Sequence, residues 1–273
     1  MINSILEMFS YTFMQRAFIV GLLISLCAAL VGVSLVLRRY SMIGDGLSHV
    51  AFGSVALATI LGIAPIEFSI PLVIVVSFLV LKINNNSKIS GDSLIAILSA
   101  SSLAIGTFLI SIKGVNIDIN SYLFGSILSL NKSDMIFSVI LSLIVIILYI
   151  ISYNKIFAIT FDDTFAKSIG INVNLYNMIF STLCSIIVVL GMRLVGSLLI
   201  SSLIIFPTLT SINIFKKFKS TVVSSVIVSI ITFIIGLTLS YFIATPTGAT
   251  IVIVNLMVFI LSYIYSIIFQ KKK

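Results

Sequence analysis

The sequence predicts an all-α membrane protein, a bundle of about nine transmembrane helices that forms one domain over residues 1–273. Hydrophobic residues make up 60% of the chain and charged residues only 9%, whereas soluble domains contain about half and a quarter. The charge-free intervals are mostly long enough to cross a bilayer, which takes about 20 apolar residues. Lys and Arg are also distributed unequally between alternate connections, as expected for membrane topology.

The expected spans follow the charge-free intervals of the sequence. The interval 68–81 is short and contains Pro71, so the count falls to eight if this segment is only half a span. The last two spans are separated by the turn sequence ATPTGAT at 244–250. In order, the predicted spans are 17–37, 46–66, 68–81, 93–112, 135–153, 172–192, 194–215, 221–243 and 249–269.

The positive charges predict an N-terminus outside and a C-terminus in the cytoplasm. With nine alternating spans, only Arg16, Lys113, Lys132 and Arg193 of the 16 Lys and Arg residues fall outside. The other twelve face the cytoplasm, where positive residues accumulate. This topology accounts for the net charge of +8 without a nucleic-acid partner and leaves the lipid bilayer as the surrounding partner.

Asp45 lies four residues before His49, the only histidine of the chain. Residues four apart share a helix face, so a carboxylate oxygen and an imidazole nitrogen can meet one divalent cation. Gly44 and Gly46 allow a closely packed or irregular backbone beside the pair. Two ligands are too few for a cage, and a homodimer with its two-fold axis along the pathway would double them. The alternative is a helix start that Asp45 stabilises through the helix dipole.

Four ordered stretches carry a resemblance to a known family. They are LRRYSMIGDGLSHVAFGSVALATILG at 37–62, TFDDTFAKSIGI at 160–171, GSLLISSLIIFPTLTSI at 196–212 and TPTGATIVIV at 245–254. Together they resemble the zinc/manganese class of ATP-binding cassette (ABC) transporter permeases, and they span nearly the whole chain.

The resemblance implies a homodimeric multi-pass subunit in the cytoplasmic membrane of a bacterium. It implies transport of a divalent metal ion, zinc or manganese and possibly iron, with no permanently bound cofactor. An extracellular metal-binding lipoprotein would deliver the ion, and a cytoplasmic ATPase would drive transport. The chain has no G-x-x-x-x-G-K-[ST] phosphate loop, so we expect a transport subunit rather than an enzyme.

The resemblance also assigns roles to individual residues. The metal residues are Asp45 and His49. The segment 158–171 is the expected ATPase-coupling element: Asp162 or Asp163 would cap a short helix, Phe165 and Ala166 would form an apolar knob, and Gly170 would end the helix. Structural or gating roles are assigned to Gly44, Gly46, Pro207, Pro246 and Gly248.

Two other classes of function remain open at the level of sequence. An ion-gradient-driven secondary metal transporter would usually show inverted repeats, and no such repeat is visible. An intramembrane enzyme could use Asp45 as a base and His49 as a metal ligand, but no second histidine accompanies them. Oxygen and nitrogen ligands suit Zn²⁺, Mn²⁺ and Fe²⁺ alike, so the residues do not select the metal.

Overall fold

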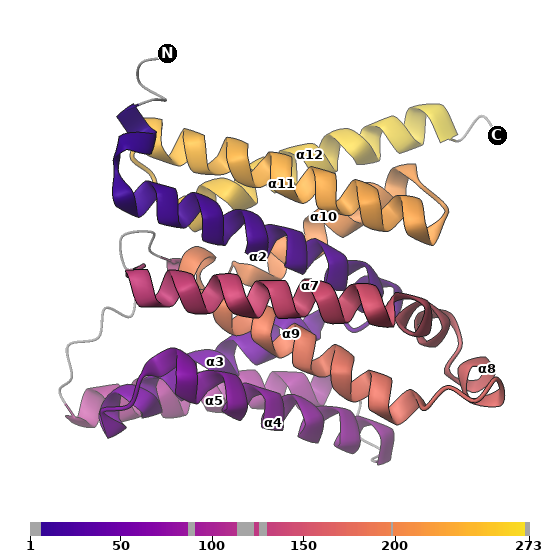
Figure 1. Cartoon of the computed structure of the whole chain (residues 1–273), viewed down its shortest axis with the longest axis horizontal. Helices are drawn as coiled ribbons and strands as arrows, with labels where there is room; N and C mark the ends of the chain where they lie inside the picture. Colours follow the sequence, from indigo (N-terminus) through magenta and orange to yellow (C-terminus); the bar gives the residue numbers. More distant parts are fainter. Residues whose placement is uncertain (1–6, 87–90, 114–122, 126–129, 198, 271–273) are drawn as a thin grey trace.

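The computed structural model describes residues 7–86, 91–113, 123–125, 130–197 and 199–270. These residues form helices and no strand, which confirms the predicted all-α class. The helices of Figure 1 are α2 (Thr12–Leu37), α3 (Met42–Leu61), α4 (Pro65–Asn86), α5 (Gly91–Lys113), α7 (Lys132–Phe161), α8 (Asp163–Ser168), α9 (Val173–Val195), α10 (Ile200–Ile214), α11 (Phe218–Ile243) and α12 (Thr247–Gln270).

Seven helices of the described residues are long and apolar enough to cross a membrane. They are α2, α3, α5, α7, α9, α11 and α12. The other two predicted spans correspond to shorter apolar helices, Pro65–Val80 within α4 and Ile200–Ile214, which is α10. The structure therefore supports a multi-pass membrane protein, with seven candidate spans and two shorter apolar helices.

Several predicted boundaries were wrong because charged residues do not end these helices, and Arg16, Glu67 and Lys155 also lie inside α2, α4 and α7. The span expected to start at 46 begins at Met42, so Asp45 lies inside α3. The span expected at 194–215 starts too early, since α9 continues through Arg193 to Val195 and α10 begins only at Ile200. Arg193 is accommodated there by an ion pair, its Nη1 lying 3.0 Å from Oδ2 of Asp134 on α7.

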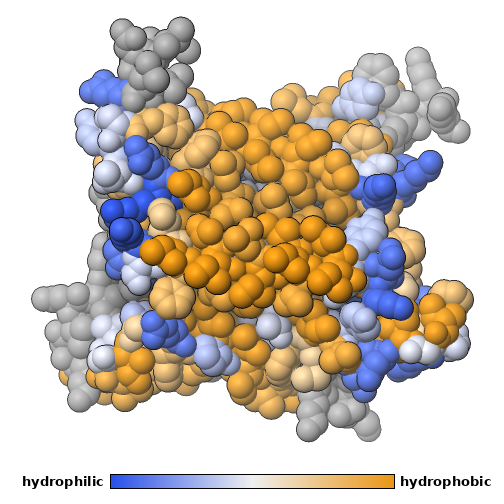
Figure 2. All heavy atoms as spheres, viewed as in Figure 1, coloured by the Kyte–Doolittle hydropathy of each residue, from blue (hydrophilic) through white to orange (hydrophobic). Residues whose placement is uncertain are grey.

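The long helices run side by side along the long axis of the molecule (Figure 1). The short helix α8, the connection from α10 to α11 and the C-terminal end of the chain lie at one end of the bundle, and the turn from α11 to α12 lies at the other. Figure 2 shows a broad hydrophobic band with hydrophilic residues at both ends. This surface is the one expected of a bundle that crosses an apolar layer.

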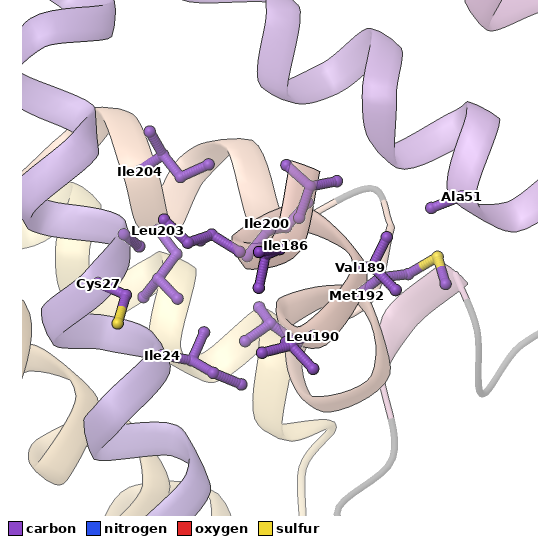
Figure 3. Packing of buried hydrophobic residues seen from close by; sticks show 14 of the residues in the cluster. Ile24, Cys27, Ala51, Ile186, Val189, Leu190, Met192, Ile200, Leu203 and Ile204 are labelled. Atoms are coloured by element: carbon purple, nitrogen blue, oxygen red, sulfur yellow. The ribbon is translucent and has the colours of Figure 1, made fainter. Parts of the chain in front are cut away.

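The core lies where α2, α9 and α10 meet (Figure 3). Its side chains include Ile24 and Cys27 of α2, Ile186 and Leu190 of α9, and Ile200 and Leu203 of α10. A Cβ at Gly32 would collide with the carbonyl oxygen of Ile204. Small residues at helix crossings allow this close approach, which is how membrane helices gain packing contacts.

Helix α3 is enclosed by α4, α5, α9 and α10. It approaches α5 through glycines: a Cβ at Gly53 would lie 2.8 Å from the carbonyl oxygen of Ser102, and one at Gly106 would lie 3.1 Å from Cα of Gly53. A Cβ at Gly46 would lie 2.6 Å from Cγ2 of Ile95. These crossings hold α3 inside the bundle and so determine where Asp45 and His49 lie.

Candidate functional site

Asp45 and His49 face each other on the first turns of α3. The Nε2 atom of His49 lies 3.9 Å from Oδ2 of Asp45. The histidine side chain is 10% exposed and the aspartate side chain 36%. Asp45 lies four residues after Ser41, the residue that precedes the helix. It therefore lies in the first turn of α3, where its charge also interacts favourably with the helix dipole, as in the alternative.

The separation of these two atoms is compatible with one shared cation. Two ligand atoms each bonded at about 2.1 Å to a tetrahedral ion lie about 3.4 Å apart. The observed 3.9 Å exceeds this value by half an ångström, which small side-chain rotations can close. The other ring nitrogen of His49, Nδ1, is buried and has no hydrogen-bond partner among the described residues. A buried polar atom without a partner is costly, so Nδ1 leaves His49 with unused hydrogen-bonding capacity.

Two serine hydroxyls on neighbouring helices lie beside the same part of α3. A Cβ at Gly44 would be 3.6 Å from Oγ of Ser201 on α10, and a Cβ at Gly46 would be 3.5 Å from Oγ of Ser99 on α5. Both hydroxyls are buried and lack a hydrogen-bond partner within the described part of the chain. The N-terminal half of α3 is thus bordered by unpaired polar groups, which sequence reasoning did not find because α5 and α10 are far from it in sequence.

Only two metal-ligating side chains meet at this place in one chain. The described residues contain no group of three or more His, Cys, Asp or Glu side chains that could hold a metal ion. Asp45 and His49 are the pair that the sequence predicted, and the structure brings them together. Gly44 and Gly46 flank them, and each faces a different neighbouring helix.

The predicted coupling segment contains the short helix α8. The Asp162 side chain caps it by accepting hydrogen bonds from the backbone N–H groups of Thr164 (2.8 Å) and Phe165 (3.0 Å). The helix ends before Gly170, whose φ of 81° is in the left-handed region where glycine is favoured. The cap and the stop therefore lie where the sequence predicted them.

The apolar knob predicted from Phe165 and Ala166 is exposed at only one of the two residues. Phe165 is 57% exposed, but Ala166 is fully buried and packs with Ile159 and Val173. Its methyl group faces the bundle because α8 folds back onto the ends of α7 and α9. Ala166 therefore anchors α8 to the protein, and its side chain is not available to a partner.

The remaining predicted residues lie in different surroundings. Pro207 is buried inside α10. Pro246 directly precedes α12, where a proline is tolerated because the first N–H groups of a helix have no internal partner. A Cβ at Gly248 would collide with the carbonyl oxygen of Val195 and lie 2.8 Å from that of Phe124. Gly248 thus lets the start of α12 pack against backbone from two distant parts of the chain.

Arg38 is a residue whose contacts the sequence analysis missed. It ends α2, and its guanidinium donates a hydrogen bond from Nη1 to Oδ1 of Asn177 on α9 at 2.8 Å. Its Nη2 lies 3.6 Å from Oδ2 of Asp163 on α8. In the sequence Arg38 counted only as one of the cytoplasmic positive charges, and a pattern in one chain does not reveal partners so far away.

The geometry and the fold define a multi-pass membrane protein with a polar pair inside an enclosed helix. The chain belongs to the ABC 3 transport family, whose family model matches residues 10–266. This membership confirms the family predicted from the four sequence stretches. Such permeases are transport subunits, and ATP hydrolysis is carried out by separate subunits, so the chain is not an enzyme.

Two curated relatives and one solved structure illustrate the similarity. The chain is 30% identical over 253 residues to the manganese import system permease protein ScaB of Streptococcus gordonii, covering 93% of this chain and 91% of that one. It is 32% identical to the high-affinity zinc uptake system membrane protein ZnuB of Haemophilus influenzae, covering 90% and 95%. A structure of PsaBC from Streptococcus pneumoniae in complex with Fab superposes with a TM-score of 0.87 at 29% identity, covering 96% and 95%.

Proposed function

We propose that this chain is the permease subunit of a bacterial importer that moves a divalent metal ion, manganese or zinc, across the cytoplasmic membrane. The observation that carries the proposal is the Asp45–His49 pair, a carboxylate and an imidazole 3.9 Å apart inside a transmembrane helix. Ionisable side chains inside a membrane protein are costly and are usually functional. The relatives named for manganese and zinc import agree with the ligand types, which bind either ion.

The ion is the cargo, so the site must bind it and also release it. A hydrated cation gives up water only if protein ligands replace it, and conduction requires that they hold it weakly enough to let it leave. One carboxylate and one imidazole from a single chain provide half of a four-ligand site. Two copies with Asp45 and His49 facing a common axis would provide two oxygens and two nitrogens.

The surface beside Asp45 supports such a homodimer. The exposed face of α5 includes Ala96, Ala100 and Ala104, which are spaced four residues apart. Large apolar side chains are exposed beside this alanine row as well, namely Ile97, Ile105 and Phe108. Small residues at four-residue spacing let two membrane helices approach closely. A second copy packed on this side would also keep the partly exposed Asp45 carboxylate away from lipid.

Nine spans with the N-terminus outside remain our preferred topology. Helix α10 has 15 residues and rises only about 22 Å, less than the hydrocarbon layer of about 30 Å. It nevertheless connects the end of α9 at one end of the bundle to the start of α11 at the other (Figure 1). Helix α4 likewise starts beside the end of α3 and leads to α5 at the opposite end. This placement supports a crossing for each of the two shorter apolar helices.

The cytoplasmic ATPase would dock on α8. Phe165 of α8 is 57% exposed, and so are Phe161 at the end of α7 (61%) and Ile169 directly after α8 (55%). Exposed apolar side chains at the hydrophilic end of a membrane protein fit a groove on a partner. An extracellular binding protein would deliver the ion at the opposite end of the bundle.

The test is metal uptake by cells that carry Asp45→Asn, His49→Ala or both changes, compared at equal membrane abundance. We expect each single change to abolish most uptake, and the double change to cost little more than the worse single one, because residues that serve one ion are not additive. Uptake of Mn²⁺ and of Zn²⁺ is measured separately, which identifies the cargo.

The matched control is Glu67→Gln, which makes the same carboxylate-to-amide change in the first turn of α4. It should leave uptake unchanged. Full uptake by the Asp45→Asn protein would refute the assignment of this pair, since asparagine preserves the shape of the side chain and removes only its charge.

A further inference from the structure

The Arg38 side chain joins three helices at the end of the bundle where α8 lies. It is 11% exposed, and a guanidinium in such surroundings must be paired. Besides the ion pair to Asp163 and the hydrogen bond to Asn177, it lies over the rings of Tyr40 (5.3 Å) and Phe180 (6.0 Å). One side chain thus holds α8, α9 and the start of the connection to α3.

The connection from Arg38 to α3 is short and internally hydrogen bonded. The N–H of Arg39 donates to the carbonyl of Val36 (3.1 Å), and the N–H of Tyr40 donates to that of Leu35 (2.9 Å). Arg39 has a φ of 60°, so the pair of bonds is a Schellman ending with a non-glycine residue in the left-handed region. The N–H of Ile43 then donates to the carbonyl of Tyr40 (3.0 Å). A short connection with these internal hydrogen bonds is stiff, so a displacement of Arg38 is passed on to the start of α3.

Asp45 follows this connection directly, within the first two turns of α3. A shift of Arg38 therefore reaches the metal-binding end of α3 through a few residues of ordered backbone. Asp163, which pairs with Arg38, is the first residue of α8. The coupling helix and the Asp45–His49 pair are far apart in sequence, and Arg38 bridges them.

A small, partly open cavity lies between α3, α4, α5 and α9, with Arg38 in its lining. Its volume is about 20 Å³, space for about one water molecule. The lining includes Ile43 and Leu47 of α3, together with Ser77, Asn177 and Ser181 from the facing helices. Close-packed interiors resist displacement, so this gap beside Ile43 and Leu47 leaves the first turns of α3 less tightly held than the backbone crossing of Gly53 with α5.

We propose that Arg38 is the positioning residue that converts a displacement of α8 into a displacement of the metal-binding end of α3. This inference rests on the proposed function. Because Arg38 carries the link, its loss should uncouple the two ends of the protein: the ATPase would still bind and turn over, but its cycle would move the metal ligands less.

The experiment uses the complete transporter, with its ATPase and its binding protein, in proteoliposomes, and measures metal transported per ATP hydrolysed. Arg38→Gln keeps a long polar side chain but removes the positive charge and the planar guanidinium group, which can reach two partners at once. Coupling energies between sites typically correspond to factors of about 5–150, so we expect a fall of about tenfold in the ratio with ATP hydrolysis retained. Asp163→Asn should lower the ratio in the same direction.

Arg39→Gln is the matched control, since it removes the neighbouring exposed charge at an unchanged backbone position. It should keep the wild-type ratio. Arg38→Lys keeps the charge but has no planar fork to reach Asp163 and Asn177 together, and it should lower the ratio partly. If Arg38→Gln does not reach the membrane, the ratio of metal transported to ATP hydrolysed in Arg38→Lys and Asp163→Asn tests the inference.

An unchanged ratio in the Arg38 and Asp163 variants would overturn the inference, even if total transport fell with protein abundance, because a purely structural residue alters the amount of working transporter and not its stoichiometry. An equal fall in Arg39→Gln would also overturn it. Failure of the proposed function is distinguishable, because the wild-type transporter itself would then move no metal.

Discussion

The crossing of α3 and α5 at Gly53 can be tested by adding a single methyl group. A Cβ at Gly53 would lie 2.8 Å from the carbonyl oxygen of Ser102, which belongs to the backbone of α5 and cannot rotate away. A Cβ at Gly44, on the same helix, would meet Cδ1 of Ile204 at 3.4 Å and Oγ of Ser201 at 3.6 Å, which are ordinary contacts. Gly53→Ala and Gly44→Ala therefore make the same chemical change in tight and in open surroundings.

The expected difference follows from these distances. To bring the Gly53 contact from 2.8 Å to an ordinary 3.4 Å, α3 and α5 must separate by about 0.6 Å, which forfeits a quarter to a half of the attraction at the affected contacts. Overpacking of this kind costs about 1–3 kcal/mol. Replacing a helical glycine with alanine also gains about 0.8–1 kcal/mol, but this gain is common to both variants. The free energies of unfolding should therefore differ by about 2 kcal/mol.

The assay is thermal unfolding of the purified protein in one detergent. A difference of about 2 kcal/mol corresponds to about 4–8 °C in Tm for a chain of this size, with Gly44→Ala the more stable variant. Equal Tm values, or a higher Tm for Gly53→Ala, would refute the reasoning that α3 is held by close backbone approach to α5. Such a result would also remove the argument that this crossing positions Asp45 and His49.

Two other predictions concern the cytoplasmic surface and the topology. Phe165→Asp should abolish association with the ATPase subunit, because a charge would enter an apolar socket, whereas Phe165→Leu should retain it; co-purification of the two subunits measures this, and normal association of the aspartate variant would contradict the docking proposal. A cysteine at Ala64 should react with an impermeant maleimide applied from outside, and one at Lys216 only after permeabilisation. Labelling of position 216 from outside would overturn the nine-span orientation, and the buried native cysteines Cys27 and Cys184 set the background.

The ends of the bundle are held together by charged residues that work in different ways. At the end away from α8, Nη1 of Arg193 lies 3.0 Å from Oδ2 of Asp134, and both side chains are largely buried at 14% and 13% exposure. This pair joins the start of α7 to the end of α9, and its removal would leave a buried charge. At the α8 end, the partner of Arg38 is half exposed, so the link can break and reform. The structure thus combines a pair that is buried on both sides with one in which the guanidinium is buried and the carboxylate is half exposed.

The sequence by itself determined the class of protein, most of its helices and the identity of its polar pair. Apolar length, charge distribution and the four-residue period of a helix are local properties, so they can be read without knowing which helices meet. The same holds for the cap at Asp162 and the stop at Gly170, which depend only on neighbouring residues. The family resemblance followed because its motifs are continuous in the chain.

Only the tertiary structure decided which side chains from different helices meet. Ala166 is buried because α8 folds back on α7 and α9, and no local pattern distinguishes it from the exposed Phe165. The unpaired hydroxyls of Ser99 and Ser201 lie beside α3, and Arg38 reaches Asp163 and Asn177. In a chain that is apolar on almost every face, hydrophobicity cannot select the partners of a helix. That choice depends on shape, on where small residues permit close approach and where charged groups find each other.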